Sequence, residues 1–383
     1  MSQLAQEASG SLLIVGDGDL GRRVLSILAQ SAYPRKIYLG ARDEERARLY
    51  VNLIKFTAAN LGLCPQIEAV HLDLNDVDQT SATIEDLSPD EVLMTASLQS
   101  WRRITELPES VFRELDEAQL GPWLPMHLAL NYDLMRAVRQ LPRPPIVINA
   151  AFPDAVGPVL ASVGLAPDIG VGNVANIIPG LTAASSLLLG IPERDLHLRL
   201  VAHHYFSHYV PRFGEADGVP HCLDAVDSGG RALALPVADV FRSLITSHRR
   251  LGGVDGQTLT ASSAVRLLHA MLATEPRLVH APAPRGRVGG YPLVISRDGF
   301  ALDLPADVTE AQAVSINEAG QVRDGIESIG ATGTVRFAGR EMSVMQRMLG
   351  YHCAEMPLAD VHAWAAELGG AYARFVSRCG APV

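Results

Sequence analysis

The first patterned stretch of the chain is Leu12-Leu13-Ile14-Val15-Gly16-Asp17-Gly18-Asp19-Leu20-Gly21, in which an apolar run leads directly into a GxGxxG loop. In such a loop the first glycine permits a tight turn after a strand, the second leaves room for a pyrophosphate, and the third lets a helix pack closely. The positive end of that helix attracts phosphates. The stretch therefore predicts a strand, turn and helix that bind a dinucleotide through Gly16, Gly18, Asp19, Leu20 and Gly21. The alternative is a glycine-rich turn without a ligand.

The next apolar stretch, Lys36-Ile37-Tyr38-Leu39, bears on which dinucleotide binds. In proteins that prefer NAD, an acidic residue about 20 residues beyond the glycines holds the ribose hydroxyls. Here the stretch ends in Gly40-Ala41-Arg42, and an arginine suits a 2′-phosphate because its planar guanidinium donates two parallel hydrogen bonds. We expect NADP, with Arg42 as the main contact. In the alternative, Arg42 lies on a solvated helix start, Asp43 holds the ribose and the cofactor is NAD.

The composition is typical of a two-domain enzyme. The chain has 383 residues, 48% of them hydrophobic and 19% charged, which is enough to fill a large core. The net charge of −10 argues against a nucleic-acid surface. Four scattered cysteines, with no CxxC pair, are typical of reduced cytoplasmic thiols, and no signal peptide is visible. We therefore expect a cytoplasmic protein with a small-molecule substrate and no nucleic-acid partner.

An uncharged segment runs from Ile169 to Pro192 and is long enough to span a bilayer on length alone. Asparagines, hydroxyl side chains and Pro179 interrupt it. We expect a strand, a loop and a short helix, buried beside the active site, and no contact with a membrane.

Apolar strands and helical stretches alternate through the first half of the chain. Strand patterns at 67–72, 91–95 and 146–149 follow helical patterns, as in a parallel sheet covered by helices. The fold class is therefore α/β, with a doubly wound Rossmann sheet over residues 1–155. Residues 156–383 predict an α+β substrate-binding and dimerisation domain, with a hairpin at 291–304, strands at 313–316 and 333–337 and a closing helix at 358–376. We expect a homodimer or a larger homo-oligomer.

Three segments resemble the lactate and malate dehydrogenases in order and spacing. They are Met94-Thr95-Ala96-Ser97, Asn131 in the next helix, and Val147-Ile148-Asn149-Ala150-Ala151-Phe152-Pro153-Asp154. The family 4 glycosidases share that fold, and the segments at 169–174 and 200–204 resemble both groups. The resemblance covers residues 11–210. It implies that Thr95 and Ala96 contact the cofactor and that Asn149 bridges cofactor and substrate.

Two positions depart from these families. Asn173 stands where the dehydrogenases place the aspartate that orients their histidine, and Gly172 stands where the glycosidases place a metal-binding cysteine. An amide fixes an imidazole tautomer but does not stabilise an imidazolium as a carboxylate does. With Asn173 as the orienting residue, we expect a catalytic histidine with a lower pKa than one paired with an aspartate.

The histidines at 203, 204 and 208 are the candidate acid–base groups. By register with the resemblance, His204 is the first choice for proton donor and His203 the second, because alternating strand faces direct only one of them into a cleft. His208 is a candidate substrate contact. In a metal-binding alternative, His204 and His208 share a helix face, but Pro211 favours a strand or loop and we expect no metal. In a structural alternative the histidines only complete a buried polar layer.

An anionic substrate needs a cation, and the resemblance implies an arginine in the loop that follows residue 95. That loop carries Arg102 and Arg103, which either bind the anion or lie exposed on a helix start. The second family arginine falls near Asn176, so the substrate is not a simple 2-hydroxy acid.

We therefore expect an NAD(P)-dependent oxidoreductase, with NADP favoured, that acts on a carbonyl or imine of a small polar, anionic metabolite. One alternative is a redox-neutral, NAD-assisted lyase or glycosidase. Another is a nucleotide-sensing protein without catalysis, for which Asn173 in place of the acid is the strongest argument.

Overall fold

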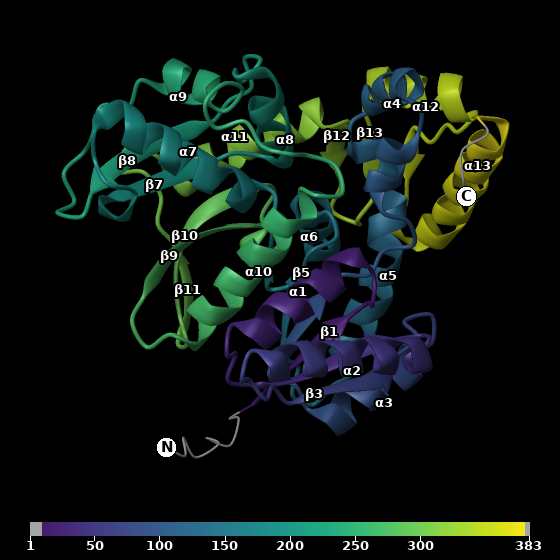
Figure 1. Ribbon diagram of the computed structural model, residues 1–383. Helices are drawn as coiled ribbons and strands as arrows, with labels where there is room; N and C mark the ends of the chain where they lie inside the picture. Colours follow the sequence, from purple (N-terminus) through teal and green to yellow (C-terminus); the bar gives the residue numbers. More distant parts are fainter. Residues whose placement is uncertain (1–9, 380–383) are drawn as a thin grey trace.

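The computed structural model describes residues 10–379, and at its centre lies a parallel sheet in the order β3-β2-β1-β4-β5-β6 (Figure 1). The six strands are β1 (Ser11–Val15), β2 (Lys36–Ala41), β3 (Ile67–His71), β4 (Glu91–Met94), β5 (Ile146–Asn149) and β6 (Ile169–Gly170). The order reverses between β1 and β4, the position at which doubly wound sheets bind their ligands. The expected N-terminal Rossmann sheet is confirmed.

Helices cover both faces of this sheet. They are α1 (Asp19–Gln30), α2 (Glu44–Asn60), α3 (Val77–Leu87), α5 (Leu124–Arg139) and α6 (Pro153–Ala161), whereas α4 (Glu109–Asp116) packs on the short helix Trp101–Glu106. The apolar run of β1 explains the two layers, because neighbouring strand residues point to opposite faces. Leu12 and Ile14 join the core with α1 and α2, whereas Leu13 and Val15 join the core with α3 and α5.

The second half of the chain contains three small antiparallel sheets. Their strands are β7 (Leu196–Val201) with β8 (Cys222–Asp227); β9 (Arg277–Pro282), β10 (Gly290–Ser296) and β11 (Gly299–Leu302); and β12 (Ile326–Ile329), β13 (Val335–Phe337) and β14 (Glu355–Met356). The helices are α7 (Val174–Leu189), α8 (His204–Phe213), α9 (Val237–Ser243), α10 (Gln257–Leu272), α11 (Glu310–Arg323), α12 (Gly339–Leu349) and α13 (Val361–Cys379). The expected α+β architecture and the hairpin β10–β11 are confirmed. Short 3-10 helices lie at η1 (Trp101–Glu106), η2 (Gly121–Trp123), η3 (Glu193–Asp195), η4 (Pro284–Gly286) and η5 (Leu358–Asp360).

Three local predictions are wrong. In the segment 169–192 the expected strand and loop are present, but the short helix expected after them is the sixteen-residue α7, which continues through Pro179 because its buried face packs into an apolar core. The segment after residue 203 is helix α8, in which Pro211 falls in the last turn. The expected strand at 313–316 lies inside α11, because Thr309 and Gln312 form a capping box that starts a helix just before it.

The end of the chain returns to the first domain. Helix α13 packs along α5, as Figure 1 shows, and both contribute to one apolar core with Trp123 and Tyr372 in edge-to-face contact. On the other side, α10 packs along α1. Strand β6 completes the N-terminal sheet beyond residue 155, so the division of the chain at that residue stays a prediction.

Candidate active site

A cavity of about 1520 Å³ opens at the carboxyl ends of the parallel strands. Its walls come from the glycine loop after β1, the end of β2, the segment from β4 to α4, the start of α8 and the loop before α10. Ten predicted site residues line it: Gly16, Gly18, Asp19, Leu20, Arg42, Thr95, Ala96, Asn173, His204 and His208. Arg102 and Arg103 line it as well, whereas Gly21, Asn149 and His203 lie behind its wall.

The three loop glycines meet different constraints. Gly16 has a φ of +110°, which favours glycine. A Cβ at Gly21 would lie 2.1 Å from the carbonyl oxygen of Gly16, so only glycine lets α1 approach the strand. A Cβ at Gly18 would meet nothing within 4 Å, and no side chain caps the amides of the first turn of α1. The space beside Gly18 and the uncapped amides fit a pyrophosphate.

The two aspartates of this loop are paired with arginines. Asp17 lies 3.1 Å from the Nη2 of Arg22 and 3.7 Å from the Nε of Arg46, and Asp19 lies 2.9 Å from the Nε of Arg23. These ion pairs offset the repulsion that two carboxylates would exert on phosphates.

Arg42 and Asp43 differ in what they face. Arg42 is exposed and lines the cavity just beyond β2. The Asp43 carboxylate accepts a hydrogen bond from the Arg46 backbone N–H at 3.0 Å and so caps α2. Asp43 does not line the cavity.

Thr95 and Asn149 both organise backbone. The Thr95 hydroxyl donates to the carbonyl oxygen of Val15 at 2.9 Å, which ties the end of β4 to the glycine loop. The buried Asn149 side chain accepts from the Ala151 N–H at 2.8 Å and donates to the Ala151 carbonyl at 3.2 Å. Asn149 thus shapes the turn that carries Phe152 into the cavity wall, and a direct contact of its amide with ligands stays a prediction.

His204 is the first residue of α8, and two buried carboxylates fix it. Its Nδ1 lies 2.8 Å from the Asp324 Oδ2, and its backbone N–H donates to the Asp154 Oδ1 at 3.0 Å. Asp324 is 1% exposed and Asp154 is fully buried. Because Asp324 occupies Nδ1, the other ring nitrogen, Nε2, is the one left for the cavity. His203 points into the core instead, where its Nδ1 accepts from the Tyr205 N–H at 3.3 Å.

The expectation for Asn173 is wrong in one respect. Its amide donates to Asp154, not to the imidazole of His204, so the orienting group is the carboxylate of Asp324 at the end of α11. Burial acts to lower the pKa of His204, but the carboxylates of Asp324 and Asp154 outweigh burial and raise that pKa above its ordinary value. The predicted low pKa is therefore wrong as well.

A row of aromatic rings runs along the cavity wall. Trp101 meets His208 edge-on at 5.4 Å between centroids, and His208 stacks on His204 at 5.7 Å. Phe152 contacts His204 at 5.8 Å and His127 at 6.1 Å. Burial is the largest of the effects that lower the pKa of His208. These rings place the apolar faces of Trp101 and Phe152 beside the stacked histidines.

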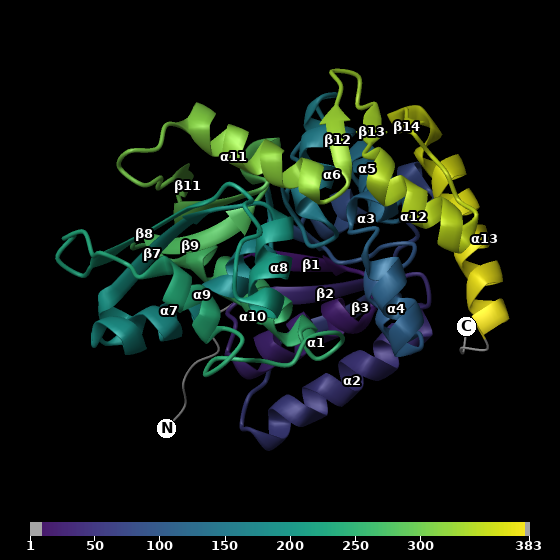
Figure 2. The ribbon, with the colours of Figure 1, turned by 90° about the horizontal axis from the view of Figure 1, so that it is seen from above.

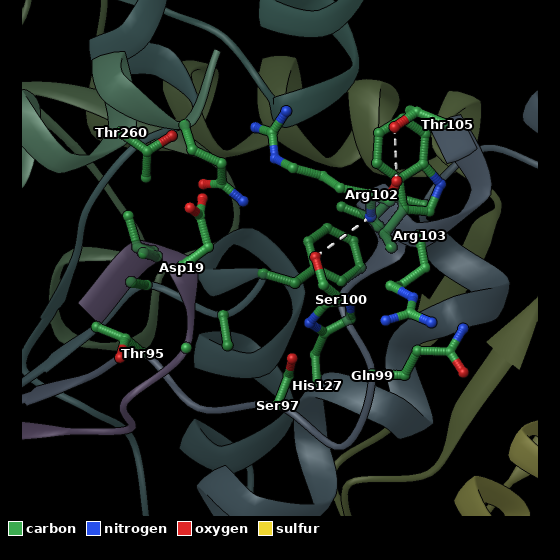
Figure 3. Close-up of a pocket in the computed structure, with 18 of the residues that line it drawn as sticks. Asp19, Thr95, Ser97, Gln99, Ser100, Arg102, Arg103, Thr105, His127 and Thr260 are labelled. Carbon is green, nitrogen blue, oxygen red and sulfur yellow. Dashed lines mark hydrogen bonds between the residues drawn. The ribbon is translucent and has the colours of Figure 1, made fainter. Parts of the chain in front are cut away.

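The two loop arginines point in different directions, as Figure 3 shows. Arg102 extends toward the side of Asp19, and its Nη1 donates to the carbonyl oxygen of Gly253. Burial, and secondarily the charge of Arg250, lower the pKa of Arg102. Arg103 turns toward Gln99 and is exposed, 3.4 Å from Glu106. Among the described arginines that line the cavity, Arg102 is the half-buried one, and it forms no ion pair with a described carboxylate.

Three residues of the site have no role in the sequence analysis: Asp154, Asp324 and His127. Asp154 stands in an otherwise apolar helix start, and His127 stands in the apolar run Leu124-Pro125-Met126-His127-Leu128-Ala129-Leu130. A lone polar residue in such an apolar run can be recognised in the sequence as a candidate site residue. Asp324 lies 120 residues from His204 in the sequence, and no local sequence pattern predicts that the two residues pair.

Two further observations on residues 10–379 concern metal binding and membrane spanning. Within that range no group of three or more histidine, cysteine, aspartate or glutamate side chains is arranged to hold a metal ion. No helix there has both the length and the apolar character needed to cross a membrane.

No protein-family model and no curated protein matches the chain. Among solved structures, the malate dehydrogenase of Cryptosporidium parvum is 15% identical with a TM-score of 0.55, over 82% of this chain and 98% of that one. The lactate dehydrogenase of Eimeria maxima, solved with NADH and oxamate, is 11% identical with a TM-score of 0.54, over 83% and 93%. The malate dehydrogenase of Plasmodium falciparum is 11% identical with a TM-score of 0.53, over 82% and 98%. This chain therefore has the fold of the lactate and malate dehydrogenases.

Proposed function

We propose that the protein is an NADP-dependent oxidoreductase that transfers hydride between the nicotinamide and a carbonyl or imine of a small anionic metabolite. The observation that carries this proposal is the His204–Asp324 pair, 2.8 Å apart, in the same cavity as the glycine loop. A half-buried histidine with a carboxylate on one ring nitrogen is equipped to exchange a proton at the other.

The residues of the cavity fit a nicotinamide dinucleotide. Gly18 and the first turn of α1 would hold the pyrophosphate, and Thr95 and Ala96 would contact the nucleotide beyond it. Arg42 would pair with a 2′-phosphate, whereas Asp43 is engaged in capping α2. The Eimeria maxima structure holds NADH, which supports this class of cofactor. When bound, the nicotinamide supplies or accepts the hydride.

His204 would move the proton. In the direction of reduction, the protonated Nε2 donates to the substrate oxygen or nitrogen, and in oxidation the neutral Nε2 accepts that proton. Asp324 accepts a hydrogen bond from Nδ1–H in both states and offsets the positive charge of the imidazolium. Asn173 and Asp154 hold the backbone at His204, so their role is positioning.

Arg102 would bind the anionic group of the substrate. Its guanidinium is half-buried within the cavity wall, where a charge-assisted hydrogen bond is stronger than in water. Phe152 and Trp101 lie on either side of the stacked histidines and would keep water from the reacting atoms.

The test is consumption of NADPH and of NADH with a panel of 2-oxo acids, with and without amines and with and without a metal chelator. The proposal predicts consumption that prefers NADPH, survives the chelator and disappears in His204→Gln. A requirement for an amine would identify imine chemistry. If no member of the panel is reduced while nucleotide stays bound through purification, the redox-neutral alternative gains support instead.

We also propose that the protein forms a homodimer or a larger homo-oligomer. Helix α2 lies along the outer edge of the molecule in Figure 2 and exposes Leu49, Leu53 and Phe56 by 57–69%. Burying such a face against a second copy is favourable. Light scattering of the wild type and of Leu53→Lys tests this, since the proposal predicts a smaller particle for the variant.

A further inference from the structure

His127 on α5 is a buried histidine whose ring makes no hydrogen bond to any residue in the range 10–379. It is 8% exposed, and neither Nδ1 nor Nε2 has a partner. Burial lowers its pKa to about 4, so the ring is neutral near pH 7 and offers one donor and one acceptor. A buried imidazole without hydrogen-bond partners destabilises the folded state, so its presence in this fold requires an explanation.

The other two buried histidines of the described chain each have at least one hydrogen-bond partner. His280 accepts from the Leu200 N–H at 3.1 Å, and the Nδ1 of His203 accepts from the Tyr205 N–H at 3.3 Å, although the Nε2 of His203 is unpaired. Only His127 among these three lines the cavity. His127 is thus the one of these three histidines whose side chain borders the cavity, and both of its ring nitrogens are buried without a partner in the described residues.

The place of His127 in the cavity relates it to the reacting centre. The ring of Phe152 contacts both His127 and His204, with centroid distances of 6.1 Å and 5.8 Å. All four of His127, Ser97, Asp19 and Thr260 line the cavity, and Figure 3 draws the first two in its lower part and the other two at its left and upper left. Arg102, the candidate for the anionic group, extends from a different segment. A substrate held by Arg102 and reacting at His204 would present a further part of its structure to His127.

We propose that His127 is a specificity-determining residue that binds an uncharged hydroxyl group of the substrate. One hydroxyl pairs with one ring nitrogen, and because it both donates and accepts, it suits that nitrogen of a neutral imidazole in either tautomer. A second carboxylate is a poorer match, because only one nitrogen carries a hydrogen and the ring brings no positive charge. This inference rests on the proposed function, and it narrows the substrate class to hydroxylated 2-oxo acids or their imines.

The test compares paired acids that differ only in a hydroxyl or a methyl group at one carbon of the side chain. Wild-type kcat/KM with NADPH should favour the hydroxylated member by about 10- to 100-fold. His127→Phe keeps the ring packing against Phe152 but should abolish the preference, while activity on the methyl member is retained. His127→Asn, which restores a donor and an acceptor, should recover part of it.

Thermal melting distinguishes substrate binding by His127 from a purely structural role, and calorimetric binding distinguishes failure of this inference from failure of the proposed reaction. Ligand-free His127→Phe should melt at or above the wild-type temperature, whereas the control His280→Phe removes a hydrogen-bond partner and should melt lower. If no acid is turned over, the paired acids are compared by calorimetric binding in the presence of NADP. A hydroxyl preference in binding that His127→Phe removes would uphold the inference while the proposed function fails. Absence of any preference in the wild type, or an equal preference in His127→Phe, overturns it.

Discussion

Replacing Asp324 by asparagine tests the pairing on which the proposed chemistry depends. The substitution keeps the side-chain shape and the acceptor for the Leu120 N–H at 3.4 Å, but it removes the charge that faces the Nδ1 of His204. The new amide would donate to Nδ1. That hydrogen bond favours the tautomer with hydrogen on Nε2, which cannot act as a base.

The magnitude follows from the burial of the pair. A hydrogen bond to a charged group contributes about 1.5–3 kcal/mol, which corresponds to about 10- to 150-fold in kcat/KM if the transition state depends on it. The direction in which folding stability changes with pH is set by the pKa of His204, which folding raises above its ordinary value of 6.5. The His204–Asp324 pair therefore contributes its full stabilisation at pH values below 6.5, and this contribution is lost as the pH rises through the pKa of the folded state.

The assay is urea unfolding of the wild type and Asp324→Asn at about pH 6 and about pH 9, with the titration of His204 followed by NMR. We expect a larger stability difference at the lower pH and a lower pKa for His204 in the variant. Asp217→Asn is the control, because Asp217 pairs with the neighbouring Arg323 and does not contact His204. A stability difference that is equal at both pH values, with an unchanged titration of His204, would refute the reasoning.

Three further substitutions test the cofactor and substrate contacts. Gly18→Ala should leave the melting temperature unchanged, because the added Cβ meets nothing within 4 Å, yet weaken NADP binding in a calorimetric titration by about tenfold or more. Arg42→Ala should lower the kinetic preference for NADPH over NADH by about 10- to 100-fold, and Arg48→Ala, which lies outside the cavity and pairs with Glu45, should not. Arg102→Ala should raise the KM for an anionic substrate by about 10- to 100-fold, whereas Arg103→Ala should leave KM within about twofold.

The first domain was predictable because its signals are local. The apolar run before Gly16 and the alternation of strands and helices depend on residues close in sequence, and the structure has the corresponding sheet. The position of Arg42 at the cavity was predictable for the same reason, because Arg42 directly follows a parallel strand and such strands end at the ligand-binding edge of the sheet.

The second half was harder because its deciding contacts are not local. The start of α11 depends on the capping box of Thr309 and Gln312, which lies just before the apolar residues at 313–316 that favour a strand when they are considered alone. Helix α8 keeps Pro211 in its last turn because its first turn is capped by His203 and packed from both sides. Tertiary packing thus outweighed the local preference of proline for breaking a helix.

The same distinction explains the error over Asn173. The family resemblance directs attention to one sequence position for the acid, but an imidazole requires only a carboxylate at Nδ1, whichever segment supplies it. Asp324 meets that requirement from the end of α11, and Asn173 instead supports Asp154, which holds the backbone of His204. The asparagine was the strongest argument for a nucleotide-sensing protein without catalysis. Once the charge on His204 is supplied from another segment, that argument no longer separates a sensor from an enzyme, and the decision rests on whether the loss of Asp324 changes a rate.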